Sequence, residues 1–291
     1  MKFCQKYLST CLLGITAFLS AAPFHAAWAQ TAPSLGTASG FSVLGGIAVT
    51  CTDSVVAGDV GSGGAFTNTT CAISGGMPPA TNPAVGGALV DLHSAYTAVQ
   101  SMPCTGTLLS TITGPMTLPP GVYCTGAALT GAGVLTLDAG GNANAVWIFK
   151  IGAALTGTGF SVVMANGGQP CNVFWAPNAD VTMTTSAFSG NILAGAGSIT
   201  LTGGALAGRA LANVAVTMTG ANVIGCAALP GAPASCKGKD HDGDDDDKDH
   251  KKCNQGVGNG PEDCDPGHSD RHHGSNDERG GTPGNPGRRD K

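Results

Sequence analysis

Threonine pairs separated by a single residue are the most regular chemical feature of this 291-residue chain. The Thr-x-Thr triplets of the chain include Thr50 and Thr52, Thr182 and Thr184, Thr200 and Thr202, Thr217 and Thr219. Each threonine holds a methyl group and a hydroxyl group on a stiff χ1 torsion. Residues i and i+2 of a strand point to the same side about 6.6–6.8 Å apart, and neighbouring strands lie about 4.8 Å apart. Stacked triplets would therefore form a regular, weakly polar lattice able to order water.

Residues suited to catalysis are scarce by comparison. Residues 30–226 contain no glutamate and one histidine, His93, which lacks an obvious base partner and suits a helix surface better. The aspartates of this stretch are scattered: Asp53, Asp59, Asp91, Asp138 and Asp180. A hydrolase needs a nucleophile with its base, a carboxylate pair or a metal. Neither a zinc-type spacing nor a phosphate-loop motif occurs in residues 30–226. We expect a non-catalytic protein without metal or cofactor, in preference to a polysaccharide-cleaving enzyme.

The N-terminus has the three parts of a secretory signal peptide. Lys2 and Lys6 precede the apolar run "LSTCLLGITAFLSAA", and "AWA" before Gln30 fits a cleavage site. The run is short for a membrane span, although a retained anchor is the alternative. We predict a signal peptide over residues 1–29, no membrane span after cleavage, and a secreted, extracellular or envelope-associated protein. The net charge of −5 argues against a nucleic-acid partner.

Export would allow the cysteines to form disulfides. Six cysteines fall in residues 30–226: Cys51, Cys71, Cys104, Cys124, Cys171 and Cys226. Pairing cannot be deduced from the sequence, because six cysteines allow many connectivities. Two local bridges, Cys51–Cys71 and Cys104–Cys124, are plausible.

The composition changes near Cys226. Residues 227–291 are charged and rich in Gly and Pro, with the run "GKDHDGDDDDKDHKK". Such a segment buries too little apolar surface to offset its ordering entropy, which predicts a disordered tail. Its carboxylates suit cations but lack the spacing of an EF-hand loop, so cations or cell-envelope polymers are its candidate partners.

One helix is expected in residues 30–226, over about residues 84–101. Apolar residues recur there at steps of three or four, with Pro83 and Pro103 marking the ends. The expected buried side consists of Val85, Leu89, Leu92, Tyr96 and Val99.

Short alternating segments separated by glycine clusters predict strands for the remainder. They are "VLTLDA", "SVVMA", "DVTMT", "SITLT" and "AVTMT", and their first outward residues are Thr136, Val163, Thr182, Thr200 and Thr217. Near-constant spacing is typical of a solenoid whose turns stack on one another, whereas a Gly-rich β-sandwich need not show it. The longest step, from Thr136 to Val163, would carry an inserted loop at "DAGGNANA". Val163 and Ala165 then indicate that the threonine ladder fades in this direction.

Several blocks in order across residues 40–226 carry a family resemblance. They are "FSVLGGIAVTCTDSVVAGDVGSGG", "LPPGVY", "LTLDAGGNANAVWIFKIGAALTG", "NVFWAPNADVTMTTSAFSGNILA", "SITLTGGALAGRALA" and "VTMTGANVIGC". The stretch resembles the microbial ice-binding protein family with a discontinuous β-solenoid. The resemblance implies an all-β fold for a domain over residues 30–226. This would be a right-handed β-solenoid of triangular section with one long helix packed alongside. It also implies that the N-terminal segment forms a coil beside the C-terminal strands.

The resemblance implies ice, or an ordered water surface, as the partner. The family motif of Thr, Ala or Gly, any residue, then Thr or Asn is matched by Thr219-Gly220-Ala221-Asn222. The candidate ice-binding face comprises Thr50, Thr52, Thr182, Thr184, Thr200, Thr202, Thr217, Thr219 and Asn222. The alternative is an extracellular structural or adhesive solenoid without ice affinity.

Overall fold

The structure, a computed structural model, describes residues 30–229. The predicted signal peptide and nearly all of the predicted tail lie outside the described residues. Within residues 30–229, no helix has the length and apolarity needed to cross a membrane.

One parallel sheet of eight strands carries all four predicted triplets. In spatial order its strands are β5 (Ala65–Thr69), β2 (Ala48–Thr52), β21 (Ala215–Thr219), β19 (Ile199–Thr202), β17 (Val181–Thr184), β14 (Leu155–Thr158), β11 (Leu129–Gly131) and β8 (Thr111–Ile112). We call the outward surface of this sheet the threonine face.

The remaining strands belong to a 14-stranded sheet that bends into two further faces. The second face contains β9 (Met116–Leu118), β12 (Val134–Asp138), β15 (Ser161–Ala165), the first halves of β18 (Ala187–Ala194) and β20 (Ala205–Ala212), β22 (Asn222–Ile224), β3 (Val55–Ala57) and β6 (Ala72–Ile73). The helix face contains β7 (Gly106–Thr107), β10 (Gly121–Thr125), β13 (Trp147–Ile151), β16 (Val173–Pro177), the second halves of β18 and β20, β1 (Phe41–Gly45) and β4 (Asp59–Ser62). Strand β18 turns the corner itself, because Ala187 pairs with Ser161 of β15 while Asn191 pairs with Phe174 of β16. Each coil therefore visits three faces, and the chain forms the predicted β-solenoid.

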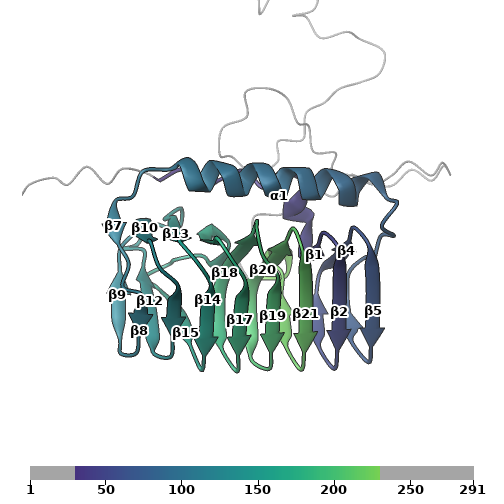
Figure 1. The fold of residues 1–291 in the computed structure, drawn as a ribbon. Coiled ribbons are helices and arrows are strands. Elements are labelled where there is room, and N and C mark those ends of the chain that lie inside the picture. The colour runs from purple at the N-terminus through teal and green to yellow at the C-terminus, as the bar shows by residue number, and fades with distance from the viewer. Residues whose placement is uncertain (1–29, 230–291) are drawn as a thin grey trace, which may run out of the picture. The chain divides into compact units, whose positions relative to one another are not determined.

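The stack of coils is not in chain order. Strand β2 lies between β21 and β5, with Thr50 opposite both Thr217 and Thr67. Helix α1 (Pro83–Ser101) then carries the chain along the solenoid to its other end, where β7 begins (Figure 1). The N-terminal coils thus extend the stack beyond the C-terminal ones, as the resemblance implied.

Side chains in register fill the interior. Tyr123, Phe149 and Trp175 are successive partners on β10, β13 and β16, and their rings stack with centroid distances of 5.7 and 3.9 Å. Leu201 and Met218 are likewise partners, and both point inward and are buried. Because coils align equivalent residues, one apolar inward position per coil produces a continuous core.

Helix α1 confirms the predicted helix over residues 84–101. Asn82 caps its start by accepting a hydrogen bond from the N–H of Ala84 at 2.9 Å. Its buried side, Val85, Ala88, Leu92, Ala95 and Val99, packs on apolar residues of the helix face such as Ile148 and Phe174. At the other end, Lys150 donates to the carbonyls of Gln100 and Met102 at 2.7 and 2.8 Å. This cation satisfies backbone acceptors at the helix C-terminus, where positive charge is favoured.

Three short 3-10 helices complete the described chain, and two of them bring cysteines together. They are η1 (Gly36–Gly40), η2 (Pro170–Asn172) and η3 (Cys226–Ala228). The disulfide Cys171–Cys226 joins η2 to η3, and no sequence pattern predicts it.

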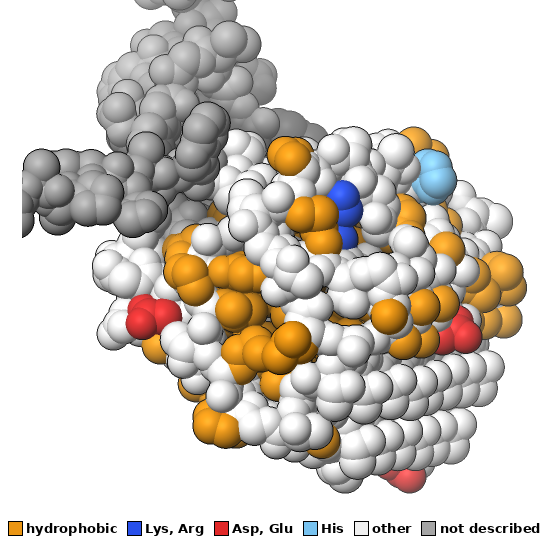
Figure 2. Space-filling model, turned by 60° about the vertical axis from the view of Figure 1, so that its left-hand side comes forward, with side chains coloured by type: hydrophobic (Ala, Val, Ile, Leu, Met, Phe, Trp, Pro, Cys, Tyr) orange, Lys and Arg blue, Asp and Glu red, His pale blue; other side chains and the backbone are white. Residues whose placement is uncertain are grey.

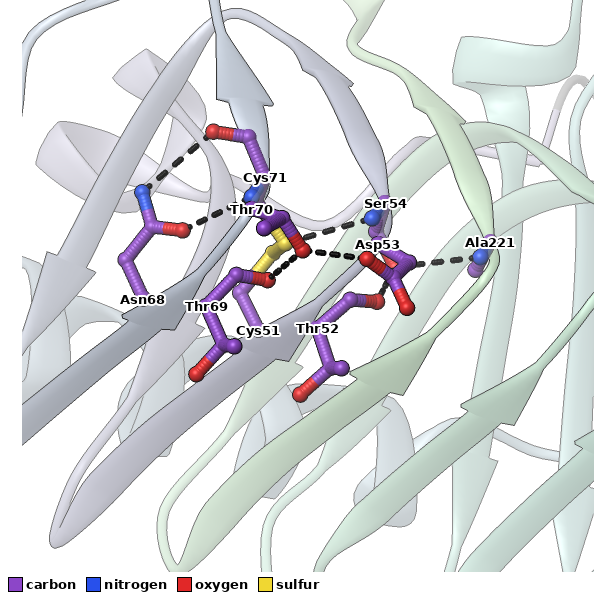
Figure 3. The surroundings of a disulfide bond; sticks show 9 residues. All are labelled: Cys51, Thr52, Asp53, Ser54, Asn68, Thr69, Thr70, Cys71 and Ala221. Carbon is purple, nitrogen blue, oxygen red and sulfur yellow. Dashed lines mark hydrogen bonds between the residues drawn. A yellow bond between two sulfur atoms is a disulfide. The ribbon is translucent and has the colours of Figure 1, made fainter.

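The two anticipated local disulfides, Cys51–Cys71 and Cys104–Cys124, are both present. Cys51 lies in β2, and Cys71 follows β5 in the last coil of the stack (Figure 3). Cys124 lies in β10, and Cys104 precedes β7 in the coil at the opposite end. Each terminal coil, which has a neighbour on one side only, is therefore covalently tied to the coil beside it.

Removing one of these bridges should loosen one end of the solenoid. For the double variant Cys51→Ala/Cys71→Ala, we expect the free energy of unfolding to fall by about 3 kcal/mol, because the bridge closes a loop of 20 residues. Hydrogen exchange should quicken first in β5. In the matched variant Cys104→Ala/Cys124→Ala, it should quicken first in β7. Equal loosening at both ends in either variant would contradict this assignment.

Candidate functional site

The register of the eight-stranded sheet aligns threonines into two columns. The first column is continuous through eight coils: Thr67, Thr50, Thr217, Thr200, Thr182, Thr156, Thr130 and Thr111. The second column runs through six: Thr69, Thr52, Thr219, Thr202, Thr184 and Thr158. Standard strand geometry places neighbours about 4.8 Å apart within a column and about 6.6–6.8 Å apart across columns. Fourteen threonines therefore form one lattice.

All eight predicted threonines belong to this lattice, and six more join them. The additional members are Thr67, Thr69, Thr111, Thr130, Thr156 and Thr158. The triplets of β14 and β5 have Gly157 and Asn68 at the central position, where the four predicted triplets have Leu, Met or Cys. A search for Thr-x-Thr with any central residue would have found both. Strand β11 contributes one threonine, which leaves no triplet in the sequence, whereas Thr111 of β8 belongs to the triplet Thr111-Ile112-Thr113, whose last residue follows the strand.

The expected fading of the ladder at Val163 and Ala165 is wrong. Val163 pairs with Thr136, and their strands β15 and β12 belong to the second face. Thr156 of β14, rather than Val163, precedes Thr182 on the threonine face. Alternation along a strand reveals which residues point outward but not which face of a solenoid they occupy.

Asn222 is the one predicted site residue that lies apart from the columns. It is exposed on β22, where it pairs with Ala205 and Val55 of the second face. The turn at Gly220 and Ala221 separates it from Thr219.

The second column ends because the corner beyond it shortens. Thr130 pairs with Thr156 on the threonine face, and Thr136 pairs with Val163 on the second face. The chain takes seven residues from Thr156 to Val163 but only six from Thr130 to Thr136. The coil of β11 therefore turns one residue earlier. Ala132 follows Gly131 and occupies the second-column position beside Thr158, so this coil has no second-column threonine.

The threonine hydroxyls are turned to solvent. Among the side-chain hydrogen bonds of residues 30–229, none involves the hydroxyl of any of the fourteen lattice threonines. Their side chains are all exposed or half-buried. In Figure 2, parallel white rows, which are backbone and side chains neither charged nor hydrophobic, occupy the lower right of the molecule, while hydrophobic side chains gather on the near end of the solenoid. The lattice is thus available to water along its length.

Left-handed residues fix the corner next to the second column. Every threonine of that column is followed by a residue with φ between 47° and 62°: Asp53, Thr70, Gly159, Thr185, Gly203 and Gly220. The N–H of such a residue donates to a second-column carbonyl in the next coil, as from Thr185 to Thr202 and from Gly203 to Thr219, both at 2.8 Å. The backbone ladder thereby continues around the corner and holds the threonine backbone in place.

Buried serines support the same corner from inside. The hydroxyl of Ser186 donates to the carbonyl of Thr184 at 3.1 Å and accepts from the N–H of Phe160 at 3.2 Å. The Ser54 hydroxyl makes the equivalent bonds, to Thr52 at 2.8 Å and from Ala221 at 3.0 Å (Figure 3). Each serine connects two coils beneath the lattice, so the surface threonines rest on a rigid frame.

Charged side chains of the domain form hydrogen bonds that stabilise turns and contacts between elements. Asp59 accepts from the N–H of Gly76 at 2.7 Å, and Asp180 accepts from the N–H of Ser198 at 2.8 Å. Asp91 lies on α1 and accepts from the hydroxyl and N–H of Thr37, which lowers the pKa of its carboxyl group. Within residues 30–229, no cluster of three or more His, Cys, Asp or Glu side chains is placed to hold a metal ion.

Arg209 clamps the N-terminal segment to the solenoid. Its guanidinium group donates to the carbonyl of Ser39 at 2.8 and 3.1 Å and to Oδ1 of Asn191 at 2.9 Å. Burial lowers the pKa of Arg209 to about 10, so the side chain stays protonated at neutral pH. His93 is exposed on α1, as expected for a surface helical histidine.

The difference between surface and buried hydroxyls can be measured. Thr200→Val should change the free energy of unfolding by no more than about 0.5 kcal/mol, because its hydroxyl has no partner within the described residues. Ser186→Ala should lower it by about 1–3 kcal/mol, because the N–H of Phe160 is left without its acceptor. Chemical denaturation of both variants tests this. An equal loss in both would show that the lattice hydroxyls stabilise the fold.

A family profile described as Ice-binding-like matches residues 30–224 of the chain. An ice-binding protein of Nostoc sp. (strain HG1) is 39% identical over 226 residues, which cover 75% of this chain and 82% of that one. Ice-binding protein 1 of Shewanella frigidimarina is 31% identical over 230 residues, covering 66% of this chain but only 26% of that protein.

Solved structures give the same result. An ice-binding protein from an Antarctic Flavobacteriaceae bacterium aligns with a TM-score of 0.64 and 38% identity, covering 67% of this chain and 47% of that one. One from the Antarctic ascomycete Antarctomyces psychrotrophicus aligns with a TM-score of 0.63 and 31% identity, covering 67% of this chain and 98% of that one. This chain therefore spans about half the Flavobacteriaceae protein and about a quarter of the Shewanella protein.

Proposed function

The chain belongs to the ice-binding-like family, and on this premise we propose that it adsorbs to ice through the threonine face. The observation that carries the proposal is the register of fourteen threonines in two columns. A crystal repeats its molecules at fixed intervals, so a surface with fixed intervals meets it at many points together.

The composition of the face suits binding to frozen water. Methyl groups favour ordered water next to them, and hydroxyl groups anchor that water by hydrogen bonds. Each contact is weak, and a mobile surface would lose much of the gain through ordering. The ladder of left-handed corners and the buried serines keep the strands rigid before binding, which limits this entropic loss. Adsorbed molecules would curve the ice front between them, depress further growth and slow recrystallisation.

The same proposal covers location and chemistry. The predicted signal peptide over residues 1–29 supports secretion, and three disulfides suit an oxidising compartment. We propose that the protein acts without catalysis and without a cofactor. The charged tail would then associate with cations or envelope polymers, while the solenoid contacts ice. An adhesive or structural solenoid remains the contrasting function, and it predicts no effect on ice.

Bulky substitutions within the columns should abolish most of the activity. Thr200 and Thr217 are neighbours in the first column, at the centre of the sheet. Thr200→Tyr and Thr217→Tyr should each remove the greater part of thermal hysteresis and of ice-recrystallisation inhibition, because a ring raised above the lattice separates its neighbours from ice. Both properties are measured on the full protein.

The matched control is Val163→Tyr, since Val163 is 44% exposed at an outward strand position of the second face. It should retain full activity. If the unsubstituted protein shows neither thermal hysteresis nor inhibition of recrystallisation, the proposed function is wrong. If Val163→Tyr loses activity while the threonine variants keep it, the active surface is the second face.

Ice activity should not depend on pH over the range in which the fold is stable. Threonine does not titrate, and both columns consist of threonine alone. Thermal hysteresis should therefore be constant between about pH 5 and pH 9. A change near about pH 6.5 would indicate that a histidine contributes, which contradicts ice binding through threonine side chains alone.

A further inference from the structure

Among residues 30–229, four residues other than glycine adopt the left-handed conformation: Asp53, Thr70, Asn166 and Thr185, with φ from 47° to 62°. For an L-residue this region is unfavourable, and for a β-branched residue it is a clear outlier. Such strain persists only where something else compensates for it, and it concentrates at functional sites. Each of the four therefore requires a local explanation.

Side-chain hydrogen bonds explain three of them. The hydroxyl of Thr70 donates to the carboxylate of Asp53 and to the carbonyl of Thr69, so the two strained residues support each other across neighbouring coils (Figure 3). Asn166 donates to the carboxylate of Asp138 at 2.7 Å, and asparagine tolerates this conformation better than most residues.

Thr185 has no such explanation. Within residues 30–229, its hydroxyl makes no hydrogen bond, and its side chain is exposed. The residues stacked on either side of it in the corner row are Gly159 and Gly203, with φ of 60° and 62°. The bond from the N–H of Thr185 to Thr202 uses only the backbone and would be available to glycine as well. Glycine would thus fit this corner with less strain than threonine.

The position of Thr185 suggests what its side chain does. It follows Thr184 directly and stands at the edge of the threonine face, so β17 and its corner present Thr182, Thr184 and Thr185 together. Its methyl group leans along the row, because a Cβ placed on Gly203 would lie 3.4 Å from Thr185 Cγ2. It therefore adds a hydroxyl and a methyl group beside the second column without disturbing the neighbouring coil.

We propose that Thr185 is an additional ice-contacting residue that widens the threonine face at its centre, and that its backbone strain is retained for this contact. This inference rests on the proposed ice-binding function. It goes beyond the two columns, because Thr185 is not a strand residue of the sheet.

The experiment compares stability and activity in Thr185→Gly. If the side chain contacts ice, thermal hysteresis should fall. The midpoint of thermal unfolding should stay equal or rise, since glycine relieves the backbone strain of the left-handed conformation. A purely structural role would lower the unfolding midpoint and leave ice activity per folded molecule unchanged. Full thermal hysteresis in the folded variant overturns the proposal.

Two further variants sharpen the result. Thr185→Ser keeps the hydroxyl with one branch fewer and should retain more activity than Thr185→Gly. Asn166→Gly also exchanges a left-handed residue for glycine, but at the end of β15 on the second face, and should retain full thermal hysteresis. Loss of activity in Asn166→Gly would contradict the assignment to the threonine face. An unsubstituted protein without thermal hysteresis would instead refute the function itself.

Discussion

Parallel stacking of coils in register is the interaction on which the rest of this structure depends. It places each residue directly above its equivalent in the next coil, so a residue type that recurs at the same position of successive coils forms a column. Inward, the rule produces the stack of Tyr123, Phe149 and Trp175. Outward, it produces the threonine columns, and at the corner it produces the row of left-handed residues. The core and the candidate site are therefore two consequences of one ladder of backbone hydrogen bonds.

A solenoid must also terminate, and this chain has two ends and one internal junction. Disulfides tie both terminal coils to their neighbours, and α1 spans between them along the helix face. At the junction, β1, β2 and β3 dock on β20, β21 and β22. Register is preserved there, because Thr50 and Thr52 stand opposite Thr217 and Thr219. The threonine face consequently crosses the break in chain order without interruption, and Arg209 helps to hold the N-terminal segment in place.

Much of this architecture can be predicted from the sequence, and the exceptions have physical causes. The interval between Thr200 and Thr217 is one coil, with Leu201 and Met218 inward, as the alternation indicates. The helix is also predictable, and the two local disulfides that the sequence suggests without fixing the pairing are present. Alternation places Val163 on the wrong face, because a period of two is the same on all faces. Thr156 and Thr158 escape the pattern because the inward residue between them is glycine, which accommodates the sulfur of Met183 and Ser186 nearby. The disulfide Cys171–Cys226 joins residues that several coils bring together, so no local sequence pattern predicts it.

The central claim is that a rigid threonine lattice recognises ice, and incorporation into growing ice tests it most directly. A single ice crystal would be grown slowly in a solution of the fluorescently labelled protein together with a second labelled protein of similar size that does not bind ice. We expect this protein to be overgrown and enriched in the ice, while the other remains in the liquid. Exclusion of both proteins from the ice to the same degree would contradict the claim.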